Sequence, residues 1–145
     1  GTGDIQLTMA QKIPVAGAVI VTTPQDVATL DARKALKMFE KLDIAVLGLV
    51  ENMAVHVCSN CGHAEHIFGE GGAARMSGQY GVPVLGSLPL QIGIREQGDA
   101  GTPIVAAQPD SAAARAYREL ARAMLAQLEQ RPKVRSGIMA SLLGG

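Results

Sequence analysis

The sequence is poor in residue types that several classes of protein require. Its 145 residues include no Trp, two Phe, two Tyr and two Cys, and 13 basic residues balance 13 acidic ones. So few aromatic side chains argue against a base-stacking surface, and a net charge of zero gives no general attraction to nucleic acid or anionic membranes. No apolar run reaches the roughly 18 residues that span a bilayer. We therefore expect a cytoplasmic protein that binds neither nucleic acid nor membrane.

The chain does contain short apolar runs that alternate with helical patterns. The apolar runs, typical of strands buried on both faces, cover residues 18–23, 45–50 and 84–88. The helical patterns cover residues 24–42, 73–80 and 111–130. This alternation predicts an α/β fold with a parallel sheet and helices on both of its faces. We assign residues 1–131 to one domain and residues 132–145 to a flexible tail.

Local signals mark the ends of these elements. Thr23 as N-cap and Pro24 at the first helical position predict the start of the first helix. Asp110 or Ser111 caps the last helix. The stripe that this helix is expected to bury consists of Ala113, Tyr117, Leu120, Ala121, Met124 and Leu128. Between the last two patterns, residues 104–105 suggest a short strand.

Every Cys and every His of the chain falls within one eleven-residue window. The window contains His56, Cys58, Cys61, His63 and His66. A pair of thiolates separated by two residues can bind one metal centre, which is the interpretation that we favour. Zinc held within one chain by both Cys and two of the His is an alternative. A thioredoxin-like redox pair is another, although no helix start follows Cys61 closely. Two unliganded thiols are the third.

The number of cysteines suggests what such a centre needs. Iron–sulfur clusters usually take four thiolates, and this chain supplies Cys58 and Cys61. Two chains related by a twofold axis would supply four. A [4Fe–4S] cluster that bridges a homodimer is therefore a hypothesis, and spacing alone does not choose between iron and zinc.

Glycine-rich segments raise the question of nucleotide binding. Residues 69–72 (GEGG) precede a helical pattern, and their amides could receive an anion, but a plain turn is favoured. The chain contains no G-x-x-x-x-G-K-[ST] sequence. We therefore expect no phosphate-binding loop and no catalytic residue in this chain by itself.

Six motifs in order resemble the Mrp/ApbC family, MinD-like P-loop ATPases that carry iron–sulfur clusters to apoproteins. They are GTGDIQLT at 1–8, VTTPQD at 21–26, GLVENM at 48–53, CxxCGH at 58–63, IFGxGG at 67–72 and GSLPL at 86–90. The resemblance implies that Cys58 and Cys61 bind a [4Fe–4S] cluster between two subunits. It also implies that Asn52 reads adenine and that the segment after Pro89, including Leu90, packs near the base. Gly1 resembles the glycine of the family's switch segment.

The chain also departs from the family pattern. The family's Walker A loop, the central strand that bears it and the Asp of the switch segment would all precede Gly1. We therefore interpret the chain as the cluster-binding and dimerisation portion of an ATP-dependent carrier whose full-length parent binds ATP and Mg²⁺. A stand-alone metal-binding module without ATPase activity is the alternative. Such a portion should leave one apolar sheet edge unpaired, so we expect it to self-associate.

Overall fold

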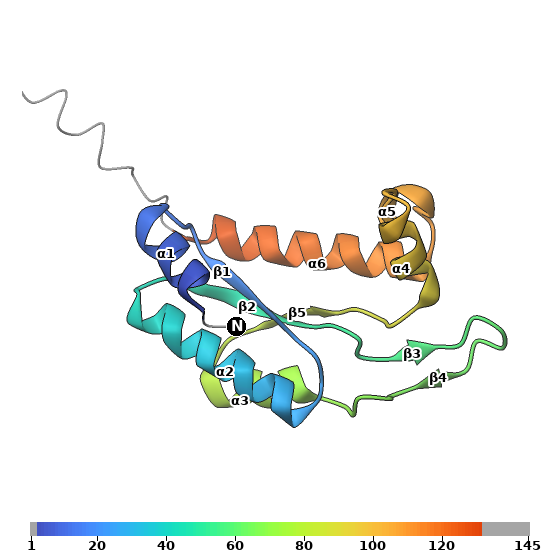
Figure 1. Ribbon diagram of the computed structural model, residues 1–145, viewed down its shortest axis with the longest axis horizontal. Coiled ribbons are helices and arrows are strands. Elements are labelled where there is room, and N and C mark those ends of the chain that lie inside the picture. The colour runs from blue at the N-terminus through green and yellow to red at the C-terminus, as the bar shows by residue number, and fades with distance from the viewer. Residues whose placement is uncertain (1–2, 132–145) are drawn as a thin grey trace, which may run out of the picture.

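The computed structural model describes residues 3–131. Its elements follow one another along the chain as shown in Figure 1: α1 (Asp4–Lys12), β1 (Ala18–Thr22), α2 (Asp26–Lys41), β2 (Val46–Glu51), β3 (His56–Val57), β4 (Ala64–Glu65), α3 (Gly72–Tyr80), β5 (Val84–Ser87), α4 (Ile92–Asp99), α5 (Ile104–Ala107) and α6 (Ala112–Glu129). The residues assigned to a tail, 132–145, and Gly1 lie outside the described residues.

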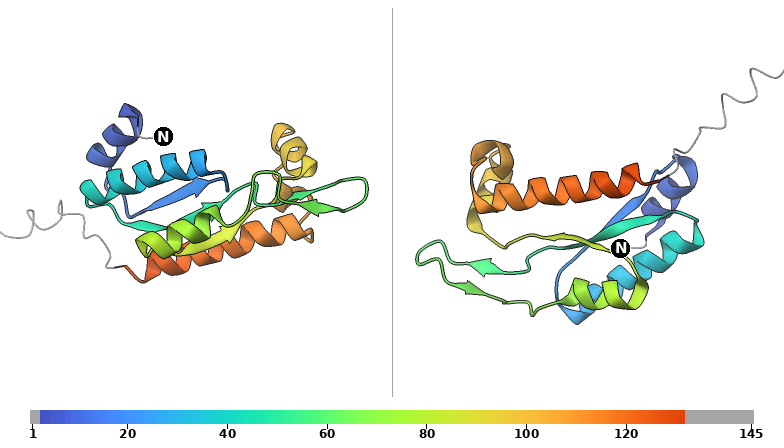
Figure 2. Two further views of the ribbon diagram at one scale, coloured as in Figure 1. Left: turned by 90° about the horizontal axis from the view of Figure 1, so that it is seen from below. Right: turned by 180° about the vertical axis from the view of Figure 1, so that it is seen from behind.

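Three parallel strands form the central sheet, in the spatial order β1-β2-β5. The middle strand β2 ends at Glu51, which lies between Thr22 of β1 and Ser87 of β5. Helices α2 and α3 cover one face of this sheet and α6 covers the other (Figure 2). The predicted α/β architecture, a parallel sheet with helices on both faces, is therefore confirmed.

The face under α2 and α3 carries the larger buried cluster. Its members are Ile20 and Leu49 from the sheet, Ala32 and Leu36 from α2, and Ala73 and Met76 from α3. Leu36, Leu49 and Met76 have no exposed surface. Burying one such side chain stabilises the fold by roughly 1.5–3 kcal/mol. This cluster is the main apolar contribution to the stability of the sheet.

The opposite face packs against α6 through Val50, Leu85 and Leu88. Gly48 permits close packing within the sheet, because a Cβ at this position would lie 2.4 Å from the Cγ of Leu85. The helix α6 starts as predicted, with the Ser111 hydroxyl accepting a hydrogen bond from the Ala114 amide at 3.1 Å.

The sequence predicted that the helix after Thr23 begins at Pro24, and this start is wrong by two residues. The helix α2 begins at Asp26 with Gln25 as its N-cap, and the Thr23 hydroxyl donates to the Gln25 side chain instead of capping an amide. Tertiary packing explains the difference. Pro24 is fully buried, and its backbone lies so close to Gly72 that a Cβ there would be 2.6 Å from the Pro24 oxygen.

Two details of the carboxyl-terminal region are also corrected. Residues 104–105 belong to α5 and not to a strand, because the Pro103 carbonyl accepts helical hydrogen bonds from the amides of Ala106 and Ala107 at 2.8 and 2.9 Å. Within the predicted stripe of α6, Ala121 and Leu128 are exposed. A sheet of three strands is too narrow to cover the whole helix.

The sequence patterns did not predict α1, α4 or the small β3–β4 sheet. Neither α1 nor α4 contains a buried residue, so neither has the apolar stripe by which a helix is recognised. The strands β3 and β4 have two residues each, too few to show an alternation.

The strand β1 is an edge of the sheet within residues 3–131. Its Val21 side chain is 60% exposed. This agrees with the predicted unpaired, apolar edge, while self-association stays a prediction. Among the helices of residues 3–131, none combines the length and the apolar character needed to cross a membrane.

Candidate functional site

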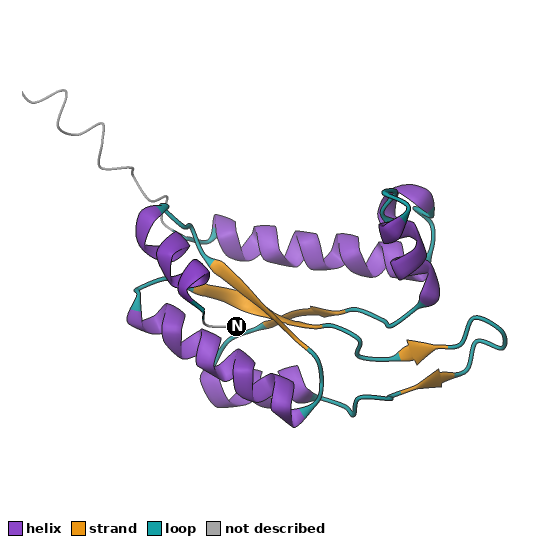
Figure 3. Ribbon diagram, viewed as in Figure 1, coloured by secondary structure: helices purple, strands orange, loops and turns teal. Residues whose placement is uncertain are grey.

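The two cysteines lie on an arm that projects from the sheet. This cysteine arm, residues 54–66, leaves the end of β2, passes through β3, turns at the cysteines and returns through β4 (Figure 3). The limbs pair antiparallel, with His56 opposite Glu65 and Val57 opposite Ala64. Sequence analysis identified the cysteines but not the hairpin that presents them.

The turn at the tip of the arm is closed by backbone hydrogen bonds. The Cys58 amide donates to the His63 carbonyl at 2.9 Å, and the Gly62 amide donates to the Cys58 carbonyl at 2.9 Å. Gly62 adopts a φ of +74°, a left-handed conformation that glycine reaches without strain. Cys58 is half-buried and Cys61 is exposed, and both are free thiols. The turn thus presents both sulfur atoms at one end of the arm.

The environment of Cys58 favours its thiolate form. Hydrogen bonds from the Cys61 amide, then from the Asn60 amide, and then from the Cys61 side chain lower the pKa of the Cys58 thiol. Such bonds stabilise negative charge on sulfur. Since the thiolate is the form that binds metals, the tip of the arm suits a thiophilic metal centre.

Within the described residues 3–131, the histidines are not grouped with the cysteines as a set of metal ligands. His56 Nδ1 lies 3.2 Å from Glu65 Oε1, and His66 Nδ1 lies 2.8 Å from the Ala54 carbonyl oxygen. His63 is exposed at the tip. Within residues 3–131 no three His, Cys, Asp or Glu side chains are grouped so that they could hold a metal ion. A Cys2His2 zinc arrangement is therefore not formed in the part of the chain that the structure describes.

The carboxyl end of the sheet holds the other predicted site residues. The Asn52 amide donates to the Thr22 carbonyl at 2.7 Å, and its side-chain oxygen accepts from the Met53 amide at 3.0 Å. Met53 has a φ of +55°, so the chain turns sharply where the strand ends. Asn52 is thereby fixed directly beyond β2, where open α/β sheets bind ligands.

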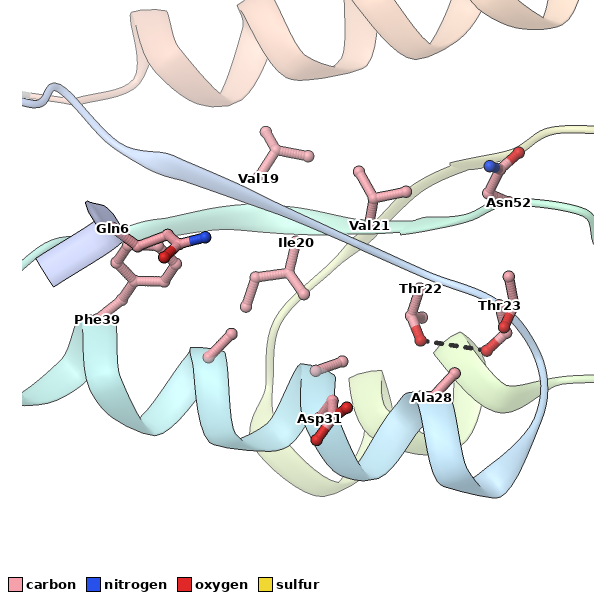
Figure 4. A pocket seen from close by; sticks show the side chains of 12 residues that line it. Gln6, Val19, Ile20, Val21, Thr22, Thr23, Ala28, Asp31, Phe39 and Asn52 are labelled. Carbon is pink, nitrogen blue, oxygen red and sulfur yellow. Dashed lines mark hydrogen bonds between the residues drawn. The ribbon is translucent and has the colours of Figure 1, made fainter. Parts of the chain in front are cut away.

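A cleft of about 470 Å³ runs between β1 and α2, and Asn52 lies at its end opposite Phe39 (Figure 4). The cleft is lined by Gln6, Val19, Ile20, Val21, Thr22, Thr23, Ala28, Asp31, Ala32, Ala35, Phe39 and Asn52. Most of this lining is apolar and follows the free edge of β1. Gln6 comes from α1, which the sequence patterns did not reveal.

Pro89 and Leu90 do not line this cleft. The backbone of Leu90 instead pairs with the cysteine arm: its amide donates to the Val55 carbonyl at 2.8 Å, and its carbonyl accepts from the Val57 amide at 3.3 Å. The Leu88 carbonyl also accepts from the Ala54 amide at 3.0 Å. The segment predicted to lie near a base thus runs beside the outgoing limb of the arm. Gly1, the fourth predicted cofactor residue, lies outside the described residues.

Known proteins are similar to this chain in sequence and in fold. The family model described as ParA, NUBPL iron-transfer P-loop NTPase, matches residues 1–125. The chain is 68% identical over 121 residues to an iron-sulfur cluster carrier protein of Pseudomonas fragi, covering 83% of this chain and 42% of that protein. It is 47% identical over 133 residues to the iron-sulfur cluster transfer protein NUBPL of Mus musculus, covering 92% of this chain and 42% of that protein.

Solved structures agree with these relatives. A nucleotide-binding protein of Archaeoglobus fulgidus, determined in complex with ADP, superposes with a TM-score of 0.61 at 40% identity over 70% of this chain and 42% of its own. The cell division ATPase MinD of Pyrococcus furiosus gives a TM-score of 0.61 at 27% identity, over 77% of this chain and 43% of its own.

The chain spans about two fifths of the length of the curated relatives it matches, between 35% and 42% in the carrier proteins of Pseudomonas, Salmonella and Escherichia. The family match, in contrast, extends over most of the chain, and it agrees with the Mrp/ApbC resemblance of the motifs. This chain belongs to the NUBPL iron-transfer P-loop NTPase family.

Proposed function

We propose that this chain is the cluster-binding and dimerisation portion of an ATP-dependent iron–sulfur cluster carrier. The observation that carries the proposal is the cysteine pair at the exposed tip of the arm, in which backbone amides lower the pKa of the Cys58 thiol. A carrier needs thiolates that bind a cluster and also stay accessible to the protein that receives it. The lowered pKa of the Cys58 thiol and the exposure of Cys61 support the proposal on both points.

The cargo is a [4Fe–4S] cluster shared by two chains. Four thiolates complete such a cluster, and each chain contributes Cys58 and Cys61. A homodimer with a twofold axis between the two arm tips provides the four sulfur atoms. Transfer to a recipient apoprotein is ligand exchange: each bond from iron to a carrier thiolate is replaced by a bond to a recipient thiolate, and no electron changes hands.

Nucleotide binding belongs to the full-length parent in this proposal. Asn52 reads the adenine, Pro89 and Leu90 lie near the base, and Gly1 belongs to the switch segment that senses the terminal phosphate of ATP bound with Mg²⁺. Support comes from the position of Asn52 at the carboxyl end of β2 and from the ADP complex of the Archaeoglobus relative. Hydrolysis is the work of the parent in the cytoplasm, and no residue of this chain is proposed to be catalytic.

Anaerobic reconstitution tests the cluster proposal. The chain is incubated with iron and sulfide, and its visible absorbance, iron and zinc contents and sedimentation are measured. We expect about two moles of iron per mole of chain, the share of one half of a bridging [4Fe–4S] cluster, together with dimerisation. Cys58→Ser should lose both, while Ser59→Ala, a matched change in the same turn, should keep both. An unchanged spectrum in Cys58→Ser, or zinc as the bound metal, would contradict the proposal.

A titration with ATP tests the nucleotide proposal. The 145-residue chain is compared with a version extended upstream to include the parent's phosphate-binding loop. We expect binding and turnover in the extended version alone. Turnover by the 145-residue chain would show that the phosphate site has been assigned to the wrong part of the parent.

A further inference from the structure

Glu51 connects the two ends of the segment that carries the cysteines. It is the last residue of β2, where the chain leaves the sheet toward the arm. Its Oε2 accepts a hydrogen bond from the amide of Ala73, the second residue of α3, at 2.7 Å. The two partners are 22 positions apart, and the cysteine arm lies between them. The Glu51 side chain therefore joins the two ends of the segment that contains the cysteine arm.

Both partners of this hydrogen bond are buried, so its loss would leave a polar group without water or a partner. The Glu51 residue is only 7% exposed and Ala73 only 1%. The N-cap of α3 is Gly71, which has no side chain with which to cap an amide of the first turn. A carboxylate at a helix N-terminus satisfies a free amide and is favoured by the helix dipole. Because an unpaired buried polar group is costly, loss of this contact should displace the start of α3.

The two limbs of the arm are attached to the sheet in different ways. The outgoing limb pairs with the segment after β5, through the backbone bonds that join Ala54 to Leu88 and Leu90 to Val55 and Val57. The return limb is joined to the outgoing limb by the antiparallel pairing of β3 with β4 and by the contact of His66 with Ala54. Between His66 and the end of α3 at Tyr80, the bond from Ala73 to Glu51 is a direct hydrogen bond to a strand of the sheet, and Arg75 adds a contact at 3.4 Å to Asp26 of α2.

We propose that Glu51 is a positioning residue for the Cys58–Cys61 pair, holding the return limb so that the tip of the arm keeps one orientation relative to the sheet. The inference rests on the proposed function. A cluster that bridges two chains is bound tightly only when each chain presents its two sulfur atoms within about 0.5 Å of the required positions. Glu51 touches neither cysteine in this scheme and acts through the path of the chain.

Three substitutions separate positioning from general stability. Glu51→Leu removes the acceptor, Glu51→Asp keeps the charge but shortens the reach to Ala73, and Glu51→Gln keeps an acceptor oxygen at the same reach. Leu36→Ala is the matched control, since Leu36 is fully buried in the core and lies outside the arm. Glu51→Asp serves as the test variant if Glu51→Leu does not fold.

Two measurements are made on these variants. The first is the rate at which reconstituted protein loses its cluster to a chelator, followed by absorbance and normalised to the folded fraction. We expect Glu51→Leu and Glu51→Asp to release the cluster about tenfold faster, the lower end of the effect seen when groups that orient metal ligands are lost. Glu51→Gln and Leu36→Ala should stay within about twofold of the unmodified chain, on the same scale.

The second measurement is hydrogen exchange in the cluster-free chain, at the amides of Cys58 and Leu90. We expect faster exchange at both amides in Glu51→Leu and Glu51→Asp, and unchanged relative protection in Glu51→Gln. Equal effects of Glu51→Leu and Leu36→Ala on exchange and release would overturn the proposal, because the role would then be structural only. If the unmodified chain takes up no cluster, the proposed function fails, and the exchange measurement still decides on Glu51.

Discussion

The sheet and the cysteine arm are stabilised by different means. Leu49 of the sheet, Leu36 of α2 and Met76 of α3 are fully buried, so apolar burial holds the strands and helices together. The arm has few buried side chains, its return strand β4 is exposed, and it is held by backbone hydrogen bonds and by the anchors at its base. The apolar core and the proposed cluster-binding residues therefore lie in different parts of the chain, and substitutions should separate their effects.

The largest effect on stability is expected from Leu49→Ala. This change removes a fully buried side chain from the middle strand and leaves a cavity, which typically costs about 2–5 kcal/mol of unfolding free energy. Urea denaturation followed by circular dichroism measures the loss. The control is Cys61→Ser at the exposed tip, which should change stability by less than about 0.5 kcal/mol. A comparable loss in both variants would mean that the arm is part of the cooperative core.

A smaller effect is expected from Gly48→Ala. The added Cβ would lie 2.4 Å from the Cγ of Leu85, and such overpacking of a core costs about 1–3 kcal/mol. The double variant Gly48→Ala/Leu85→Ala tests the cause, because removing the obstructing side chain should relieve part of the strain. Strictly additive losses in thermal denaturation would show that the two positions do not clash.

The N-cap of α6 should have a still smaller effect. Ser111→Ala removes the hydroxyl that accepts from the Ala114 amide, which costs about 1 kcal/mol. Ser111→Asp keeps an acceptor at the cap and should retain most of the stability. If both variants melt at the same temperature as the unmodified chain, the cap at the N-terminus of α6 contributes nothing to the stability of the folded chain.

The smallest effect is confined to the reactivity of one thiol. Because hydrogen bonds in the folded arm lower the pKa of Cys58, more of it is thiolate at neutral pH when the chain is folded than when it is unfolded. In a Cys61→Ser background, alkylation of Cys58 should therefore reach half its maximal rate at a lower pH in buffer than in urea. If the pH profiles in buffer and in urea coincide, the folded turn does not stabilise the Cys58 thiolate.

The principal fold elements were predictable because their signals are local. The apolar runs of β1, β2 and β5 and the helical patterns of α2, α3 and α6 were recognised from spacing alone. The start of α2 was not predicted correctly, because the backbone of Pro24 packs closely against Gly72, which is distant in sequence. The helix α5 was mistaken for a strand, since two β-branched residues after Pro103 resemble the start of a strand.

The candidate site was predictable only in part. Cys58 and Cys61 were identified from their spacing and from the family resemblance. The contact of Leu90 with the arm was not foreseen, because backbone pairing with Val55 and Val57 leaves no mark in side-chain patterns. Glu51 was overlooked for a related reason: in a linear sequence its partner Ala73 is an amide like any other.

The sequence by itself determined which reactive groups the chain has and which segments must be buried. It has two thiols in one short window and no other cysteine, and its apolar strands must be covered on both faces. These properties depend on residue types and their spacing and not on the tertiary fold. The tertiary structure decided the rest, including the projection of the arm, the contacts of His56 with Glu65 and of His66 with Ala54, and the burial of Glu51 against α3. These depend on contacts between residues far apart in sequence, which form only when the sheet packs.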